Sequence, residues 1–432
     1  MQEDFEIIKP EAQHKKSDAA KVIGLVAVFL TVALISVLLT FSLTVNYFHT
    51  APNNEYRDLA LLKKYIDQYS YYDADHDAML EAALKAYASS TGDRYTVYYD
   101  TEEFAALAED NEGRYVGIGV TVKEVEIVYM GESIRIIEIV KVADNSPASE
   151  AKLLVGDMIY SLYENGEEIF ANDVGKDAFS SMIRGEEGTY AEISVLRPSE
   201  NGYDKIDVTL QRRKVENKSV EYASAANEPT VGVVTVSQFD LNTPVLLSEA
   251  FGAFAKRGIN KVVIDLRDNP GGDLNSVIAC ASYFVHEGDV IISAEDNANN
   301  VVTYKALSRT YGASYSSCNV AKNDIGKFKD FEIAVLVNGN TASAAELLTA
   351  VFRDYELATV IGENTFGKGT MQTIYSLERY GLEGGIKITT SVYFPPCGEN
   401  YDGVGIAPDI VVNKIDGEVD NQLLAAIDEL TK

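Results

Sequence analysis

The longest apolar stretch of the chain runs from Val22 to Tyr47 and contains no charged residue. Its 26 residues are enough to cross a bilayer as a helix, with some tilt. Lys15, Lys16 and Lys21 lie just before it and the first basic residue counted after it is Arg57, so the positive-inside rule predicts a cytoplasmic N-terminus. A cleavable signal peptide is the alternative, but its apolar region would be shorter and a small-x-small site would follow. We therefore predict an uncleaved, single-pass anchor in the cell membrane, with the remainder of the chain outside the cytoplasm.

Two amphipathic segments follow the apolar stretch. Apolar residues recur at helical spacing in residues 55–70 and again in residues 76–88, where Asp75 is a suitable N-cap. The segment Gly92–Thr96 then supplies a turn. This pattern predicts a pair of helices just outside the membrane, whose simplest role is packing or oligomer formation.

Residues 113–212 show short apolar runs separated by turn residues. One short helix is expected near Asp177–Ile183. The pattern predicts a compact, mostly-β domain of about 100 residues. Its expected strands are Val116–Val120, Arg135–Val140, Asp157–Leu162 and Ala191–Leu196.

From residue 230 onwards, apolar strands alternate with amphipathic helices. This order is typical of an α/β domain with a largely parallel, buried sheet. Residues 287–330 lack a clear period, and we interpret them as a surface excursion. The expected strands are Val231–Val236, Val262–Leu266, Ile333–Val337, Thr359–Gly362 and Ile386–Phe394, and the expected helices are Val245–Lys256, Ser276–Val285, Ala344–Arg353 and Gln422–Leu430.

Chain length and net charge limit the number of domains and the classes of binding partner. The chain has 432 residues and a formal net charge of −29. The length predicts two or three domains, and the charge opposes a nucleic-acid surface, which needs clustered Lys and Arg. We divide the chain into a cytoplasmic tail (1–21), a transmembrane helix (22–47), a helical region (55–112), a mostly-β domain (113–212) and an α/β core with a C-terminal helix (213–432).

The cysteines and histidines disfavour metal chemistry. The cysteines Cys280, Cys318 and Cys397 are odd in number and have no metal-ligand spacing, so we expect free thiols. None of the four histidines lies in an HExxH pattern or in the context of a catalytic base. We therefore predict no metal site, and we expect no cofactor.

Ser343 is the candidate nucleophile. It follows an apolar strand and begins a helix, a position at which open α/β sheets usually bind ligands. The helix N-terminus offers unpaired N–H groups to a developing oxyanion, and Ala342 and Ala344 leave room for a peptide. The alternative is that Thr341 or Ser343 only caps the helix.

Lys368 would supply the base that a serine nucleophile needs. A neutral amine can take the serine proton if burial lowers the lysine pKa from about 10.4 towards roughly 7–8. Gly367 and Gly369 allow the backbone to bend around the lysine. Gln372 could hold the amine through a neutral hydrogen bond, whereas a carboxylate there would raise the pKa.

Two glycine turns are candidate anion sites. Asp268–Gly272 falls at the end of an expected strand, and we expect Gly271 or Gly272 to form an oxyanion hole with Ala344. A plain turn is the alternative. In the mostly-β domain, the N–H groups of the Gly117-Ile118-Gly119 turn can face the carboxylate of a peptide that adds to the strand edge.

Six segments, taken in order, closely resemble the carboxyl-terminal processing proteases, also called tail-specific proteases. The resemblance spans roughly residues 55–430 and implies a crotonase-like α/β core with an inserted PDZ domain. It also implies a Ser343–Lys368 dyad assisted by Gln372, and a mobile PDZ domain that Arg184 couples to the catalytic centre. The six segments are Gly92–Thr96, the PDZ-like stretch within 113–212, Asp265–Gly272, Thr341–Glu346, Thr365–Gln372 and Gly403–Asp409.

The resemblance predicts a membrane-anchored serine endopeptidase that cleaves extracytoplasmic proteins near their C-termini. The expected partners are substrates with unstructured, apolar C-terminal tails, and a homodimer is also conceivable from the family. The chain departs from the family at Arg94, where proline is usual, at Lys152, where glycine is usual, and at Thr341 and Ala345, where serines are common. None of these positions carries an expected catalytic group.

Two other functions stay open. Gly362 to Lys368 nearly spells a P-loop, but Gly369 stands where Mg²⁺ binding needs Ser or Thr, and the following residues favour a strand. The second alternative is a membrane-tethered PDZ scaffold with an inactive core. It is disfavoured because every candidate catalytic residue is present.

Overall fold

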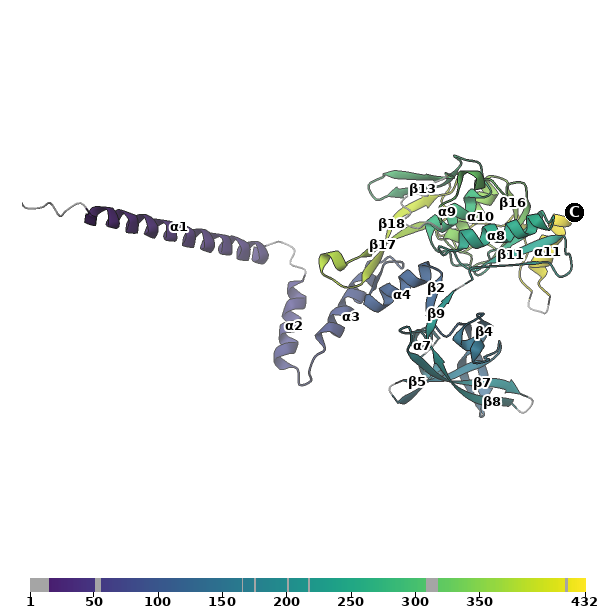
Figure 1. Cartoon of the computed structure of the whole chain (residues 1–432), viewed down its shortest axis with the longest axis horizontal. Coiled ribbons are helices and arrows are strands. Elements are labelled where there is room, and N and C mark those ends of the chain that lie inside the picture. Colours follow the sequence, from purple (N-terminus) through teal and green to yellow (C-terminus); the bar gives the residue numbers. More distant parts are fainter. Residues whose placement is uncertain are drawn as a thin grey trace, which may run out of the picture. The chain divides into compact units, whose positions relative to one another are not determined.

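The computed structural model describes residues 15–50, 56–164, 166–174, 176–199, 202–216, 218–307, 318–415 and 419–432. The chain is of mixed α/β type (Figure 1). It divides into two compact units, one up to Ala82 and one from Ala83 onwards.

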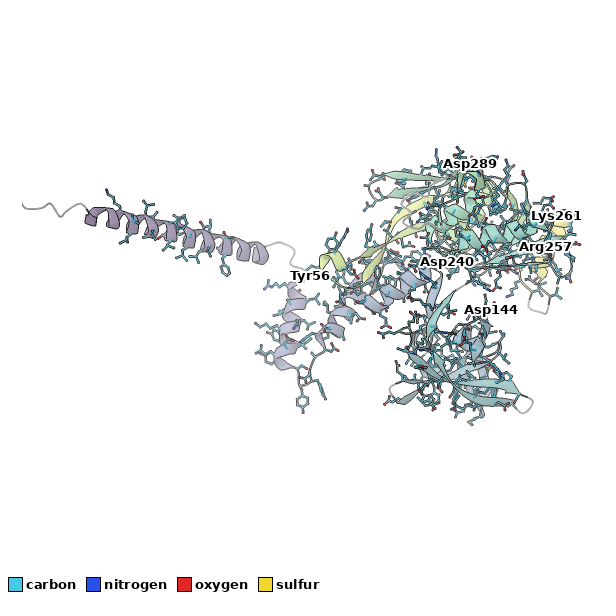
Figure 2. All side chains as sticks on the ribbon, in the orientation of Figure 1. Tyr56, Asp144, Asp240, Arg257, Lys261 and Asp289 are labelled. Carbon is cyan, nitrogen blue, oxygen red and sulfur yellow. The ribbon has the colours of Figure 1, made fainter. Side chains whose placement is uncertain are left out.

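The first unit is helical. Helix α1 (Lys15–Thr50) contains one segment, Lys21–Ser42, that is long and apolar enough to cross a membrane, and a signal sequence would have the same features. The large apolar side chains of this segment are exposed and project from the helix in Figure 2. Because α1 begins at Lys15, the predicted polar tail is helical over its last residues, and residues 1–14 lie outside the described part.

The predicted helical pair is confirmed. Helix α2 spans Arg57–Tyr69 and helix α3 spans His76–Ser89. Asp75 caps α3 as expected, because its carboxylate accepts a hydrogen bond from the Ala78 N–H at 3.0 Å.

A six-stranded sheet forms the centre of the second unit. Five strands run parallel and β10 joins one edge antiparallel, which confirms the predicted sheet type. Successive strand residues point to opposite faces, so Ile264 packs in one core and Val263 in another. The strands, in sheet order, are β10 (Val220–Ser224), β11 (Val231–Val236), β12 (Lys261–Asp265), β15 (Glu332–Val337), β16 (Ala358–Gly362) and β19 (Ile410–Val411).

Helices cover both faces of this sheet, as buried parallel strands require. Phe251, Val277 and Leu348 join Ile264 in the larger core, and Ile427 packs with Val263 on the opposite face. The first three come from α8 (Thr243–Lys256), α9 (Leu274–Ser282) and α10 (Ala344–Asp354), and Ile427 from α11 (Asn421–Thr431).

A second sheet joins segments that are distant in the sequence. Strand β18 pairs with β1, β13 and β17, and β14 extends the sheet beyond β13. The interpretation of residues 287–330 as an irregular excursion is therefore wrong for β13 and β14, because they pair with each other and β13 also pairs with β18. The strands are β1 (Val97–Tyr99), β13 (Val290–Asp296), β14 (Val301–Lys305), β17 (Thr370–Ser376) and β18 (Gly385–Phe394), and helix α4 (Thr101–Asn111) follows β1.

The mostly-β part packs around a core of its own. Its antiparallel sheet has the order β3-β4-β5-β7-β8, with β6 paired to β5. Ile137, Ile159, Phe179 and Val195 are among the residues buried in this core. A two-stranded ribbon, β2–β9, lies where the chain enters and leaves. The elements are β2 (Arg114–Gly117), β3 (Val120–Tyr129), β4 (Glu132–Val142), α5 (Pro147–Glu150), β5 (Met158–Glu164), β6 (Glu167–Phe170), α6 (Ala171–Val174), α7 (Lys176–Ile183), β7 (Tyr190–Ser199), β8 (Gly202–Gln211) and β9 (Arg213–Glu216).

Candidate active site

Ser343 lies in a strained turn between β15 and α10. It is the N-cap residue of α10 and has φ 57° and ψ −117°, a combination that residues other than glycine rarely adopt. The turn is fixed against the end of β12, because the Ala342 N–H donates to the Asn269 carbonyl at 2.9 Å and the Thr341 hydroxyl donates to the Leu266 carbonyl at 2.8 Å. The serine is thus held at the carboxyl end of the parallel strands, as predicted.

A buried carboxylate, Glu346, joins the serine turn to the lysine loop. The side chain is 0% exposed, and its Oε2 accepts the N–H groups of Ser343 and Lys368, each at 2.8 Å. Its Oε1 accepts the Thr365 hydroxyl at 2.6 Å and the Gly367 N–H at 2.7 Å. Hydrogen bonds to an ionised acceptor are roughly twice as strong as neutral ones. Glu346 therefore fixes the main chains of both candidate catalytic residues relative to each other.

Tyr393 forms a second link between the same two residues. Its hydroxyl donates to the Lys368 carbonyl at 2.5 Å and is also hydrogen-bonded to the Ser343 side chain. The Tyr401 hydroxyl in turn donates to the Tyr393 hydroxyl at 3.1 Å. Burial raises the pKa of both tyrosines above the ordinary value, so both phenols stay neutral near neutral pH.

Lys368 has the environment of a base. The pKa of its amine is lowered to about 8, mainly by burial and in addition by the positive charges of Lys387 and Arg94. The negative charges of Asp93 and Glu346 oppose this shift without reversing it. Near neutral pH, a part of the amine is therefore unprotonated, as acceptance of a serine proton requires.

Gln372 contacts the sheet around the lysine loop. Its amide donates to the hydroxyls of Thr370 and Thr389, each at 3.1 Å. Within the described part of the chain, the Lys368 amine forms no hydrogen bond to Ser343 or to Gln372. Main-chain bonds thus bring Ser343 and Lys368 together, and the catalytic roles of all three residues stay predictions.

Gly271 approaches the serine turn more closely than another residue type could. It has φ 104°, and a Cβ built on it would lie 2.8 Å from the Ser343 Cβ and 2.9 Å from the Ala344 nitrogen. Its N–H already donates to the Asn269 side chain at 2.9 Å. Ala344 is the first residue of α10, where a main-chain N–H has no acceptor within the helix. As an oxyanion donor, Ala344 thus has more suitable surroundings than Gly271.

The predicted tail-binding turn borders a cavity. Strand β2 ends at Gly117 and β3 begins at Val120, so Ile118 and Gly119 form the turn between them. A cavity of about 400 Å³ lies against this turn. The Ser180 hydroxyl on its wall is buried and has no partner among the described residues. The other lining residues include Gly117–Val122, Ile183 and Arg184.

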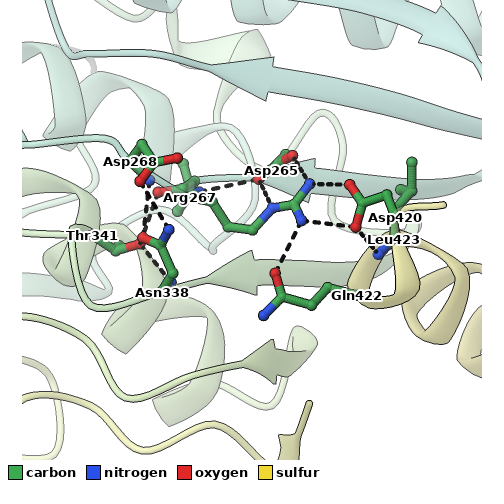
Figure 3. Close-up of polar contacts among 9 residues, drawn as sticks. Asp265, Arg267, Asp268, Asn338, Thr341, Asp420, Gln422 and Leu423 are labelled. Atoms are coloured by element: carbon green, nitrogen blue, oxygen red, sulfur yellow. Dashed lines mark hydrogen bonds and ion pairs between the residues drawn. The ribbon is translucent and has the colours of Figure 1, made fainter. Parts of the chain in front are cut away.

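Arg267 ties the end of β12 to helix α11 (Figure 3). Its guanidinium bonds both carboxylate oxygens of Asp265, at 2.9 and 2.7 Å, and both of Asp420, at 2.9 and 2.7 Å. It also donates to the Gln422 amide oxygen at 3.0 Å. The next residue, Asp268, has φ 60° and accepts the Asn338 amide at 2.9 Å. This network holds the start of the Asp-Asn-Pro-Gly-Gly turn in place.

Sequence reasoning assigned no role to Glu346, Tyr393 or Arg267. A signal existed for Glu346, because Ser followed three residues later by Glu at a helix start is typical of a capping box. No local pattern marks Tyr393. The P-loop alternative is wrong, because a strand, β17, and not a helix follows Lys368.

Comparisons with known proteins find similar sequences and a similar fold among serine proteases. The model of peptidase family S41 matches residues 230–412. A "Probable CtpA-like serine protease" from Staphylococcus epidermidis is 28% identical over 410 residues, which cover 93% of this chain and 76% of that protein. A protein of the same description from Staphylococcus saprophyticus is 29% identical over 393 residues, which cover 90% of this chain and 72% of that protein. A solved structure described as an S41 protease from Bacteroides fragilis has a TM-score of 0.51 at 17% identity and covers 84% of this chain and 92% of its own, a similarity of fold alone.

Proposed function

The chain belongs to peptidase family S41, and from this premise we propose that it is a membrane-anchored serine endopeptidase of the carboxyl-terminal processing type. Ser343 is the proposed nucleophile and Lys368 the proposed base. The observation that carries the proposal is the strained Ser343 turn, joined to the Lys368 loop by the buried Glu346 carboxylate. The lowered pKa of Lys368 supports the same assignment.

In the proposed reaction, the neutral Lys368 amine takes the Ser343 proton as Oγ bonds to the substrate carbonyl carbon. The carbonyl oxygen becomes an oxyanion, which the main-chain N–H groups of Ala344 and Gly272 or Gly271 stabilise. The Lys368 ammonium then gives its proton to the leaving amine, and the peptide C–N bond breaks. Water, deprotonated by the same lysine, hydrolyses the acyl-enzyme. Gln372 would help to orient the loop through Thr370 and Thr389.

We also propose that the mostly-β part is a PDZ domain inserted before a crotonase-like core. The carboxylate of a substrate tail would bind at the Gly117-Ile118-Gly119 turn, and its apolar side chains would enter the adjoining cavity. The position of that cavity beside β3 and α7 supports this assignment. Arg184 lines the cavity and contacts Asp110 at 3.4 Å, which suits a residue that transmits tail binding to the core.

Substrates of this enzyme would be extracytoplasmic proteins with unstructured, apolar C-terminal tails. The charge distribution around Val22–Tyr47 supports an anchor that places the catalytic part outside the cytoplasm. The domain limits given above, 55–112, 113–212 and 213–432, are proposed on the same basis. A homodimer is proposed from the family resemblance alone.

The test uses the full chain in detergent or lipid nanodiscs and an unstructured protein with an apolar C-terminus. The parent should cleave it, and Ser343→Ala and Lys368→Ala should not, while all three proteins keep the same far-UV circular dichroism. Substrates whose tail ends in a charged residue or an amide should show a raised KM. Tail binding without cleavage by the parent would instead favour the scaffold alternative, and cleavage by Ser343→Ala would refute the nucleophile.

A further inference from the structure

The turn at Gly92–Thr96 lies against the lysine loop, although some 270 residues separate them in the sequence. Asp93 closes the turn by accepting the Tyr95 N–H at 3.0 Å and the Thr96 hydroxyl at 2.7 Å. Burial opposes ionisation of Asp93, but hydrogen bonds from Thr96 and Thr389 outweigh it and lower the pKa of this carboxyl. The turn is thus anchored to strand β18, the strand that also carries Lys387 and Tyr393.

Two cations share the aromatic ring of Tyr95. The Lys368 amine nitrogen lies 4.4 Å from the ring centroid, and the Arg94 guanidinium carbon lies 4.7 Å from the same centroid. Arg94 also donates to the Tyr95 hydroxyl and lies 5.1 Å from the ring centre of Phe366, two residues before the lysine. Both distances to Tyr95 lie within the range of cation–π attraction.

The two contacts on Tyr95 have opposite consequences for Lys368. An aromatic face alone attracts an ammonium and so favours the protonated lysine. Arg94 already lies at this ring, and arginine side chains in proteins are positively charged, so a second positive charge beside it is repelled. The ring can then orient the lysine side chain without holding it as an ammonium.

We propose that Arg94 and Tyr95 are positioning residues for the lysine base: Tyr95 places the amine, and Arg94, through the shared ring, disfavours its ammonium form. This inference rests on the proposed role of Lys368. Four charged groups act on that amine: Arg94 and Asp93 from the turn, Lys387 from β18 and Glu346 from α10. Tyr393 contacts Lys368 only as a neutral phenol at the main-chain carbonyl.

The test compares Arg94→Gln, which removes the charge, with Arg94→Lys, which keeps it. A matched control is Arg379→Gln, because Arg379 also stacks on its neighbouring tyrosine, Tyr380, at 4.7 Å but is not among the charges acting on Lys368. For the first readout, each variant is made in the full chain in detergent with Ser343→Ala added. Mass spectrometry then measures how the acylation of Lys368 by acetic anhydride depends on pH. The second readout is the pH profile of kcat/KM with Ser343 intact.

Arg94→Gln should raise the midpoint of Lys368 acylation by about half a pH unit, and so lower kcat/KM about threefold at pH 7 but not at pH 10. Arg94→Lys and Arg379→Gln should match the parent. Tyr95→Leu should lower kcat/KM at every pH. An unchanged acylation midpoint in Arg94→Gln, or an equal loss of activity at all pH values, overturns the inference. If Ser343→Ala still cleaves substrate, the proposed function fails instead, whatever the acylation midpoints show.

Discussion

The loops that carry Ser343 and Lys368 differ from the walls of the proposed tail-binding cavity in the kind of contact that holds them. In the first region, four donors converge on the Glu346 carboxylate, which is 0% exposed. In the second, Arg184 meets Asp110 at 3.4 Å, and the two side chains are 49% and 47% exposed. Buried, charge-assisted bonds fix geometry, whereas an exposed ion pair contributes about 0–1 kcal/mol and breaks readily. The two loops are thus pre-organised, while the contact proposed to couple tail binding to the core is adjustable.

The largest effect is expected for Lys368→Met. The Glu346 contact uses the main-chain N–H of residue 368, which methionine retains, so the fold should persist. Without the base, kcat/KM should fall about 10⁴-fold or more. Steady-state proteolysis and thermal unfolding measure the two quantities. Activity within tenfold of the parent would remove Lys368 from the mechanism.

Glu346→Gln tests whether the buried carboxylate fixes the site. The amide would turn an NH₂ group towards donors that need an acceptor, so stability should fall by about 2–4 kcal/mol. Misplaced loops should lower kcat about 10²-fold. The control is Glu356→Gln at an exposed position just after α10, and this substitution should change neither stability nor kcat. Equal stability of the Glu346→Gln and Glu356→Gln proteins in urea unfolding would contradict the proposed clamp.

The pH dependence of the parent tests the proposed role of Lys368 as a base. Only the neutral lysine accepts a proton, and the pKa of Lys368 is lowered to about 8. Below that value the neutral fraction falls about tenfold per pH unit, so kcat/KM should rise with pH from 6 to 8 and then level off. Initial rates on a neutral peptide from pH 6 to 9.5 test this. A flat profile would contradict a lysine base.

Asp420→Asn probes the Arg267 network at the edge of the site. The hydrogen bond from Arg267 is the main cause that lowers the Asp420 pKa. A folded-state pKa below the unfolded value means stability that is present above the unfolded pKa and lost as pH falls through the folded pKa. The variant should lose about 1 kcal/mol at pH 7, and its difference from the parent should shrink as the pH falls below the ordinary titration range of an aspartate. A difference that persists at low pH would indicate another cause.

Of these substitutions, Arg184→Gln should change stability and kcat/KM least. Because the pair with Asp110 is exposed, stability should change by less than about 0.5 kcal/mol. If Arg184 couples tail binding to the core, kcat/KM for tailed substrates should fall a few-fold, while a short peptide without a tail should be cleaved as by the parent. An equal loss on both substrates would place Arg184 in the catalytic centre itself.

Much of the core could be predicted because its periodicity is local. Val231–Val236 is a strand with the predicted bounds, and α10 begins at the predicted Ala344. By contrast, β13 was missed because its pairing is with residues such as Phe394, about a hundred positions away, and its short sequence has no clear alternation. Among the described residues, Cys280, Cys318 and Cys397 form no disulfide, which agrees with the odd cysteine count.

The candidate site residues could be proposed from the sequence, but the contacts that hold them could not. Ser343 and Lys368 follow from the chemistry of their motifs, but the positive φ of Ser343 depends on the surrounding loops and has no sequence signature. The sequence around Tyr95 does not indicate that its ring lies beside the Lys368 amine, because the two residues are far apart in the sequence. The roles of Gln372, Gly271 and Gly272 depend on a bound substrate, which no sequence pattern supplies.

The Arg267 network also bears on the order of synthesis. A ribosome makes Ser343 and Lys368 before it makes Asp420 and Gln422, yet the strand end beneath the serine turn is completed by those later residues. A nascent chain that already carries the serine and the lysine therefore still lacks part of the network that supports the candidate site. On the proposed function, the emerging protease would gain a fully supported serine turn only once helix α11 has folded back onto the sheet.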